Sequence, residues 1–128
     1  MSDCSCVYVG ECEEIEALTH KKRVAHKTYM CSECNSDIHV GQTYEYFHGV
    51  FYGKFYTYRT CLDCLSVQKS FFCKGRVFRG TWEMLEDHIY GMDGQISSDC
   101  LVPLTKPARD KVCDKIEDYW EKWEDDDE

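Results

Sequence analysis

The segment from residue 31 to residue 64 reads CSECNSDIHVGQTYEYFHGVFYGKFYTYRTCLDC, and it begins and ends with a C-x-x-C pair. A tight turn within such a pair brings two thiolates to neighbouring corners of a tetrahedral zinc site, about 2.3 Å from the ion. Two pairs complete the coordination, so the spacing predicts a zinc ion bound by Cys31, Cys34, Cys61 and Cys64.

The 26 residues between the pairs are more than a simple zinc loop needs, and they predict regular secondary structure. Residues 43–47, TYEYF, and 54–58, KFYTY, are rich in β-formers, and Gly49 and Gly53 between them indicate a turn. We expect two antiparallel strands here. The run LSVQKSFF at 65–72 lacks Gly and Pro and has helix-like apolar spacing, which predicts a helix that begins at the second cysteine pair.

This order of cysteine turn, hairpin and helix is typical of a treble clef, so we predict an α+β fold with such a zinc core. Thr81 can cap a short helix, WEMLEDHIY, that Gly91 and Gly94 end, and residues 109–123 form a second amphipathic helix after a connecting loop at 91–109. We expect one domain, 1–128, with an N-terminal arm at 1–28, a zinc core at 29–75, a helical extension at 76–123 and an acidic tail at 124–128.

The size and composition of the chain limit the protein class. With 128 residues the chain has the size of one domain, and 43% hydrophobic residues supply a core. No apolar run is long enough to span a membrane, and the first twelve residues lack the features of a secretory signal. We therefore expect a cytoplasmic protein without a membrane partner, in which ten cysteines favour metal ligation over disulfides.

The net charge of −9 is distributed unevenly along the chain. Residues 1–19 carry a net −5, residues 20–109 carry +3, and residues 110–128 carry −7. An anionic surface repels nucleic acid and attracts basic patches of proteins. The charge pattern therefore favours a protein partner and predicts only weak binding of nucleic acid at physiological salt.

The run VAHKTYMCSECNSDIHVGQTYEYFHGVFYGKFYTYRTCLDCL, with the best match at 26–65, resembles a group of small phage and prophage zinc-binding proteins. Their pattern is approximately R-K-x-H-x-C-x-E-C-x-x-x-I-x-x-G-x-x-Y, followed by a glycine-containing aromatic hairpin and T-C-x-x-C. Cys4, Cys6 and Cys73 also resemble cysteines of that group. The segment at 26–30, just before the first cysteine pair, departs from the pattern of the group. The resemblance implies a phage-encoded zinc protein in the host cytoplasm and no established activity.

The cysteines outside the twin pairs suggest a second zinc site that fixes the N-terminus. Its candidate ligands are Cys4, Cys6 and Cys73, with Cys12, His88 or Cys100 as the fourth. The alternative is that these cysteines are buried thiols, which is how we interpret Cys113 on the apolar stripe of the last helix. We expect one zinc ion per chain from the twin pairs, and two if the second site forms.

The sequence carries no sign of catalytic chemistry. Four sulfur ligands leave no open position on a zinc ion, whereas a catalytic zinc keeps one. There are no paired carboxylates, no G-x-S-x-G motif and no phosphate-binding loop, and none of the five histidines stands beside a nucleophile motif. We therefore expect a protein that is not an enzyme.

The predicted hairpin is rich in aromatic side chains, and only one of its two faces can rest on the zinc core. The candidate binding surface consists of Tyr52, Lys54, Tyr56, Tyr58 and Arg59. Such a surface could stack single-stranded bases or contact a protein, or its rings could fill the core under the terminal segments.

The function that we predict is non-enzymatic binding of a host protein, such as a component of transcription or defence, with the acidic ends imitating nucleic acid. Such an interaction weakens as salt rises, because the charges are screened over about 8 Å at physiological ionic strength. The alternative is a nucleic-acid-binding zinc module that uses the basic segment 21–27 and the tyrosine-rich hairpin.

Overall fold

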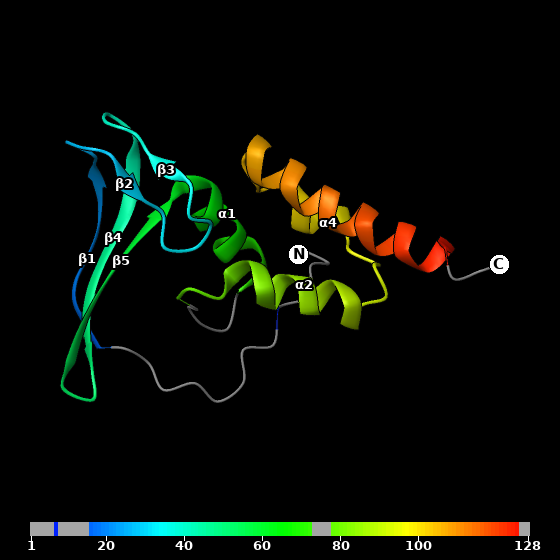
Figure 1. The fold of residues 1–128 in the computed structure, drawn as a ribbon, viewed down its shortest axis with the longest axis horizontal. Helices are drawn as coiled ribbons and strands as arrows, with labels where there is room; N and C mark the ends of the chain where they lie inside the picture. Colours follow the sequence, from blue (N-terminus) through cyan, green and yellow to red (C-terminus); the bar gives the residue numbers. More distant parts are fainter. Residues whose placement is uncertain (1–6, 8–15, 73–77, 126–128) are drawn as a thin grey trace.

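The computed structural model describes Val7, residues 16–72 and residues 78–125 of the chain. Its architecture is α+β, with an antiparallel sheet at one end and helices at the other (Figure 1). The strand order of the sheet is β1-β4-β5, and these strands span Glu16–Val24, Thr43–Phe51 and Lys54–Cys61. A small two-stranded ribbon of β2 (Tyr29–Met30) and β3 (Asp37–Ile38) is inserted between β1 and β4.

Strands β4 and β5 form the hairpin that the sequence predicts, although both extend beyond the expected β-rich runs. The turn consists of Tyr52 and Gly53, which both have positive φ, at +50° and +76°. Positive φ at both central residues is the geometry of a two-residue I′ turn, which matches the twist of the flanking strands. Gly49, which we expected in the turn, lies inside β4 instead.

Residues 16–24 form strand β1, although the sequence analysis places them in an N-terminal arm. The strand pairs with β4 along its whole length, from Glu16↔Val50 to Val24↔Thr43. Almost all of its side chains are exposed, so neither face of this edge strand is covered by other described residues. A strand without a buried face lacks the apolar alternation by which strands are recognised in a sequence.

The helices of the described residues are α1 (Leu62–Phe71), α2 (Thr81–Gly91), α3 (Ser98–Leu101) and α4 (Lys106–Asp125). Helices α1 and α2 lie where the sequence predicts them, except that the N-cap of α2 is Gly80 and Thr81, the expected cap, is its first helical residue. Helix α4 begins earlier than expected, because Thr105 Oγ1 accepts a hydrogen bond from the Ala108 N–H at 3.4 Å and Pro107 suits a first helical turn. The connection that we expected to be a loop contains α3.

Two hydrophobic clusters hold these elements together. The larger one lies between the helices and includes the fully buried side chains of Phe71, Leu85 and Val112. The smaller one surrounds the cysteine pairs and includes the buried Ile38. Trp82 of α2 packs against both clusters, so α2 connects the helical end of the molecule to the cysteine end.

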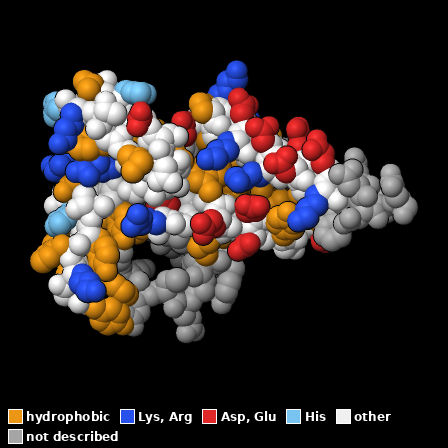
Figure 2. All heavy atoms as spheres, in the orientation of Figure 1, with side chains coloured by type: hydrophobic (Ala, Val, Ile, Leu, Met, Phe, Trp, Pro, Cys, Tyr) orange, Lys and Arg blue, Asp and Glu red, His pale blue; other side chains and the backbone are white. Residues whose placement is uncertain are grey.

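Charged side chains are separated between the two ends of the molecule. Lys and Arg side chains gather over the sheet, whereas most Asp and Glu side chains lie over the helices, with several Lys and Arg side chains among them (Figure 2). Three consecutive basic side chains of strand β1 are exposed: Lys21, Lys22 and Arg23. Among the described residues, no helix combines the length and the apolar character that crossing a membrane requires.

Candidate metal centre

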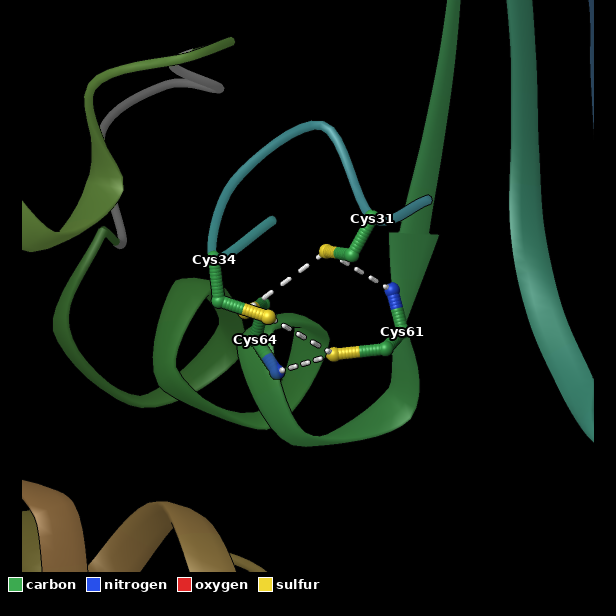
Figure 3. A group of neighbouring side chains, drawn as sticks. All are labelled: Cys31, Cys34, Cys61 and Cys64. Carbon is green, nitrogen blue, oxygen red and sulfur yellow. Dashed lines mark hydrogen bonds between the residues drawn. The ribbon is translucent and has the colours of Figure 1, made fainter. Parts of the chain in front are cut away.

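Four cysteine side chains from three parts of the chain converge on one point (Figure 3). Cys31 and Cys34 lie between β2 and β3, Cys61 ends β5, and Cys64 lies in the first turn of α1. Their sulfur atoms all lie within 4.8 Å of one another; Cys31 Sγ is 3.9 Å from Cys64 Sγ, and Cys34 Sγ is 3.8 Å from Cys61 Sγ. All four thiols are free, since a disulfide requires about 2.05 Å. The cluster could therefore hold a metal ion.

Backbone hydrogen bonds of a tight turn position the first pair. The Asn35 N–H donates to the Cys31 carbonyl at 3.0 Å, and the Cys31 N–H donates to the Ser36 carbonyl at 2.8 Å. Asn35 has a φ of +61°, a left-handed conformation that asparagine tolerates better than most residues. The chain then enters β3, where the buried Ile38 packs with the cysteines.

N–H groups point at the sulfur atoms from several directions. Cys31 Sγ accepts hydrogen bonds from the backbone N–H groups of Glu33 and Cys61, both at 3.4 Å. Cys61 is the N-cap of α1, and its Sγ accepts from the Cys64 N–H at 3.5 Å. Cys64 Sγ accepts from Trp82 Nε1 at 3.3 Å. Such bonds favour the thiolate form and orient the sulfurs as ligands.

Three of the thiols, Cys31, Cys61 and Cys64, perturb one another's pKa values. Hydrogen bonding with Cys61 and then Cys64 holds the pKa of Cys31 well below its usual range. The contact with Cys31 is the main cause that raises the pKa of Cys61 to about 12, and it likewise raises the pKa of Cys64. One thiolate therefore forms readily and opposes the next. Four thiolates this close need a cation among them, which is the electrostatic condition of a metal site.

Two residues that the sequence analysis missed connect the cluster to α2. Trp82 donates a hydrogen bond to Cys64 Sγ. Its ring also makes a cation–π contact with Lys111 of α4, whose Nζ lies 4.1 Å from the ring centre. The carboxylate of Glu33, inside the first cysteine pair, accepts hydrogen bonds from the first residue of α2, Thr81. The acidic residue within CSEC was the signal from which the role of Glu33 could have been predicted. Its partner, Thr81, is 48 residues away in the sequence, so the contact itself could not.

The predicted second metal site lies largely outside the described residues. Cys4, Cys6, Cys12 and Cys73 all belong to that undescribed part. Of the alternative fourth ligands, Cys100 is buried and disulfide-bonded, so its sulfur is not a free thiol. The ring of His88, on α2, lies edge-on to the ring of Phe71 at 6.3 Å between ring centres.

The predicted tyrosine surface is divided between the two faces of the sheet. Tyr58 is only 9% exposed and stacks on Phe78 at 4.4 Å between ring centres, so its ring fills the core and offers no surface. Tyr56 stacks on Tyr58 on that same face. Arg59 is the next residue along β5 after Tyr58 and therefore lies on the opposite face. The two remaining residues of the predicted surface, both exposed at the end of the hairpin, are Tyr52 and Lys54.

Comparison of the chain with protein-family models, with curated proteins and with solved structures finds no significant match. The assignments that follow therefore rest on this chain's own residues and their geometry.

Proposed function

We propose that the chain is a zinc-binding protein of treble-clef type, without catalytic activity, that binds a basic surface of a host protein through α4. Three features support this function: the sulfur cluster, the order of elements around it, and the separation of charge on α4. The charge separation carries the proposal about the partner.

Zinc fits the donor set. A tetrahedron of sulfurs, each about 2.3 Å from a central ion, has edges of about 3.8 Å. Two of the sulfur pairs, at 3.8 and 3.9 Å, match that edge. Four thiolates select zinc over the harder ions magnesium and calcium, which prefer oxygen, and they leave no open position for a substrate. The proposed ion is therefore structural.

The elements around the cluster support the treble-clef assignment. The first cysteine pair lies in a turn between two short strands, and the β4–β5 hairpin follows it. The second pair bridges the end of the hairpin and the first turn of α1. This is the order of cysteine turn, hairpin and helix that we expected from the spacing. The additional strand β1 pairs with β4 outside that unit.

Three of the four lysines of α4, all after its first turn, contact α2. They recur on one side of the helix and meet successive turns of α2. The contacts are Lys111 Nζ at 4.1 Å from the centre of the Trp82 ring, Lys115 Nζ at 3.7 Å from Glu86 Oε2, and Lys122 Nζ at 5.5 Å from the centre of the Tyr90 ring. Positive charge on α4 is thus used in packing the two helices together.

The acidic residues of α4 form a separate stripe. They recur at intervals of three and four residues, so they share another side of the helix, and all are exposed. We define the acidic stripe as Asp110, Asp114, Glu117, Asp118 and Glu121. None of them forms an ion pair with another described residue. Because Lys111, Lys115 and Lys122 contact α2, Lys106 is the one lysine of α4 on the side of the stripe, and it offsets a single one of the five negative charges.

The spacing of the acidic stripe suggests the class of partner. From Asp110 to Glu121 the helix rises about 17 Å, so carboxylates follow one another about every 4 Å. Phosphates along one strand of DNA follow one another about every 3.4 Å. The stripe therefore presents negative charge at nearly the density of a nucleic-acid strand. A host protein with a nucleic-acid-binding surface is the partner that fits it.

The test compares two charge variants as baits in a bacterial lysate. Asp114→Asn with Asp118→Asn removes two charges from the acidic stripe, whereas Glu83→Gln with Asp87→Asn removes two exposed charges from α2. We expect the wild type and the α2 variant to retain the same nucleic-acid-binding protein, released by added duplex DNA and by salt, and the stripe variant to lose it. Equal retention by both variants would contradict the proposal.

A further inference from the structure

One face of the sheet carries alternating basic and aromatic side chains, which we call the ladder: Arg23, Tyr46, Arg59 and Tyr29. Arg59 Cζ lies 4.2 Å from the centre of the Tyr29 ring and 5.7 Å from that of the Tyr46 ring. Arg23 Cζ lies 3.8 Å from the centre of the Tyr46 ring. Lys27 Nζ extends the series at 5.3 Å from the Tyr29 ring. The ladder thus runs from β2 across β5 and β4 to the edge strand β1.

Among the residues that the structure describes, none supplies a counter-charge to the basic side chains of this face. Lys21 pairs with Tyr46, which pairs with Arg59, so these three side chains share the face. No basic residue of the face has a carboxylate at ion-pair distance in the described part of the chain. The buried Glu45 lies on the opposite face, where its Oε2 is 3.1 Å from His20 Nε2. The buried Nε of Arg59 has no hydrogen-bond partner among the described residues.

An exposed aromatic ring lies on the same face of the sheet, between the ladder and the hairpin turn. Phe55 of β5 is 68% exposed, and it lies two positions along the strand from Thr57, the partner of His48. The rings of Phe55 and His48 are stacked, 5.9 Å apart between ring centres and 5° from parallel. A large apolar ring that stacks on a neighbouring ring and is open to water is a surface on which another planar group can stack.

We infer that this face of the sheet binds single-stranded nucleic acid. Lys21, Arg23, Lys27 and Arg59 contact the phosphates, and Phe55 stacks with a base. An acidic peptide would neutralise the basic side chains of this face, but its carboxylates would not stack on the aromatic rings. A duplex would hide its base faces from Phe55. The inference rests on the sheet and is independent of the acidic stripe on α4.

The phosphate contacts make this binding dependent on salt, because each one releases counterions from the nucleic acid. Four cations, Lys21, Arg23, Lys27 and Arg59, give a salt slope of about −2.8 for a single strand. Affinity then falls about 20-fold between about 50 mM and about 150 mM salt. Binding is thus strong at low salt and weak at physiological salt.

The experiment is fluorescence anisotropy with a labelled oligothymidine of about 15 nucleotides, a length within the range that flat β-surfaces cover. The matched pair of variants is Lys21→Gln and Lys22→Gln, which remove the same charge from adjacent exposed positions on opposite faces of β1. Phe55→Ala tests stacking. The zinc content of each variant is measured to show that the fold is intact.

We expect Lys21→Gln to weaken binding about fivefold and to reduce the salt slope by about 0.7, and Lys22→Gln to change affinity by about twofold or less. Phe55→Ala should weaken binding about tenfold. Three results would overturn the inference: no binding at low salt, equal effects of the two lysine variants, or displacement of the oligonucleotide by polyglutamate of the same length as effectively as by unlabelled oligothymidine.

Discussion

The carboxylate of Glu33, between the two cysteines of the first pair, caps the helix that begins at Thr81. Its Oε1 accepts hydrogen bonds from the backbone N–H and the hydroxyl of Thr81, and its Oε2 accepts from the Arg79 N–H at 2.6 Å. The N-cap residue of α2, Gly80, has no side chain with which to do this. A negative charge at a helix N-terminus also interacts favourably with the helix dipole. Glu33 therefore makes the cysteine turn part of the α2 terminus.

Replacing Glu33 should remove the hydrogen bonds that connect the cysteine turn to the N-terminus of α2. Glu33→Ala removes three acceptor contacts at once, and we expect it to lower the free energy of unfolding of the metal-loaded protein by about 1–3 kcal/mol. Asp37→Ala, an exposed acid nearby in β3, is the control and should change it by about 0.5 kcal/mol or less. Urea unfolding measures both. Equal effects would show that Glu33 contributes only surface charge.

The cysteine cluster should determine both metal content and folding. Structural zinc supplies on the order of 10 kcal/mol, comparable to the whole stability of a domain, so Cys61→Ser should yield a poorly folded, metal-poor chain. Cys113→Ser, at a free and half-buried cysteine of α4, should keep the metal. Native mass spectrometry counts the zinc ions. An unchanged zinc count in Cys61→Ser would contradict the assignment.

The turn that follows α2 should tolerate no side chain at Gly94. This residue has a φ of +71°, and a Cβ there would lie 2.6 Å from Cδ1 of the buried Tyr119. We expect Gly94→Ala to destabilise the protein by about 2–4 kcal/mol, from backbone strain and displacement of the ring. Gly91→Ala is the control, because a Cβ at Gly91 meets nothing within 4 Å. Its effect on thermal unfolding should be neutral or slightly stabilising.

The parts of the structure that the sequence predicts are those with local signatures. The C-x-x-C spacing predicts the convergence of Cys31, Cys34, Cys61 and Cys64, because each turn positions its own two sulfurs. Likewise, β-rich runs with a glycine between them predict the hairpin, and apolar periodicity predicts α1, α2 and the core-facing side of α4.

The features that the sequence does not reveal depend on contacts between distant segments. Whether Tyr58 faces water or the core depends on Phe78, which approaches it from the segment before α2. The lysines of α4 read as ordinary surface charge until Trp82 and Glu86 are placed opposite them. Strand β1 shows no alternation because neither of its faces is buried, so only its pairing with β4 identifies it.

The last prediction concerns the hydrogen bond from Trp82 Nε1 to Cys64 Sγ, 3.3 Å long, which couples the metal centre to the helices. Trp82→Phe keeps an aromatic ring for both hydrophobic clusters and for Lys111 but removes the N–H donor. Groups that orient metal ligands are worth about 10–100-fold in affinity, so we expect Trp82→Phe to weaken zinc binding about tenfold in competition with a chromophoric chelator. Trp120→Phe, at a 40% exposed tryptophan of α4, should leave the affinity unchanged. If both variants bind zinc as the wild type does, the indole contributes packing alone and the coupling passes through Glu33.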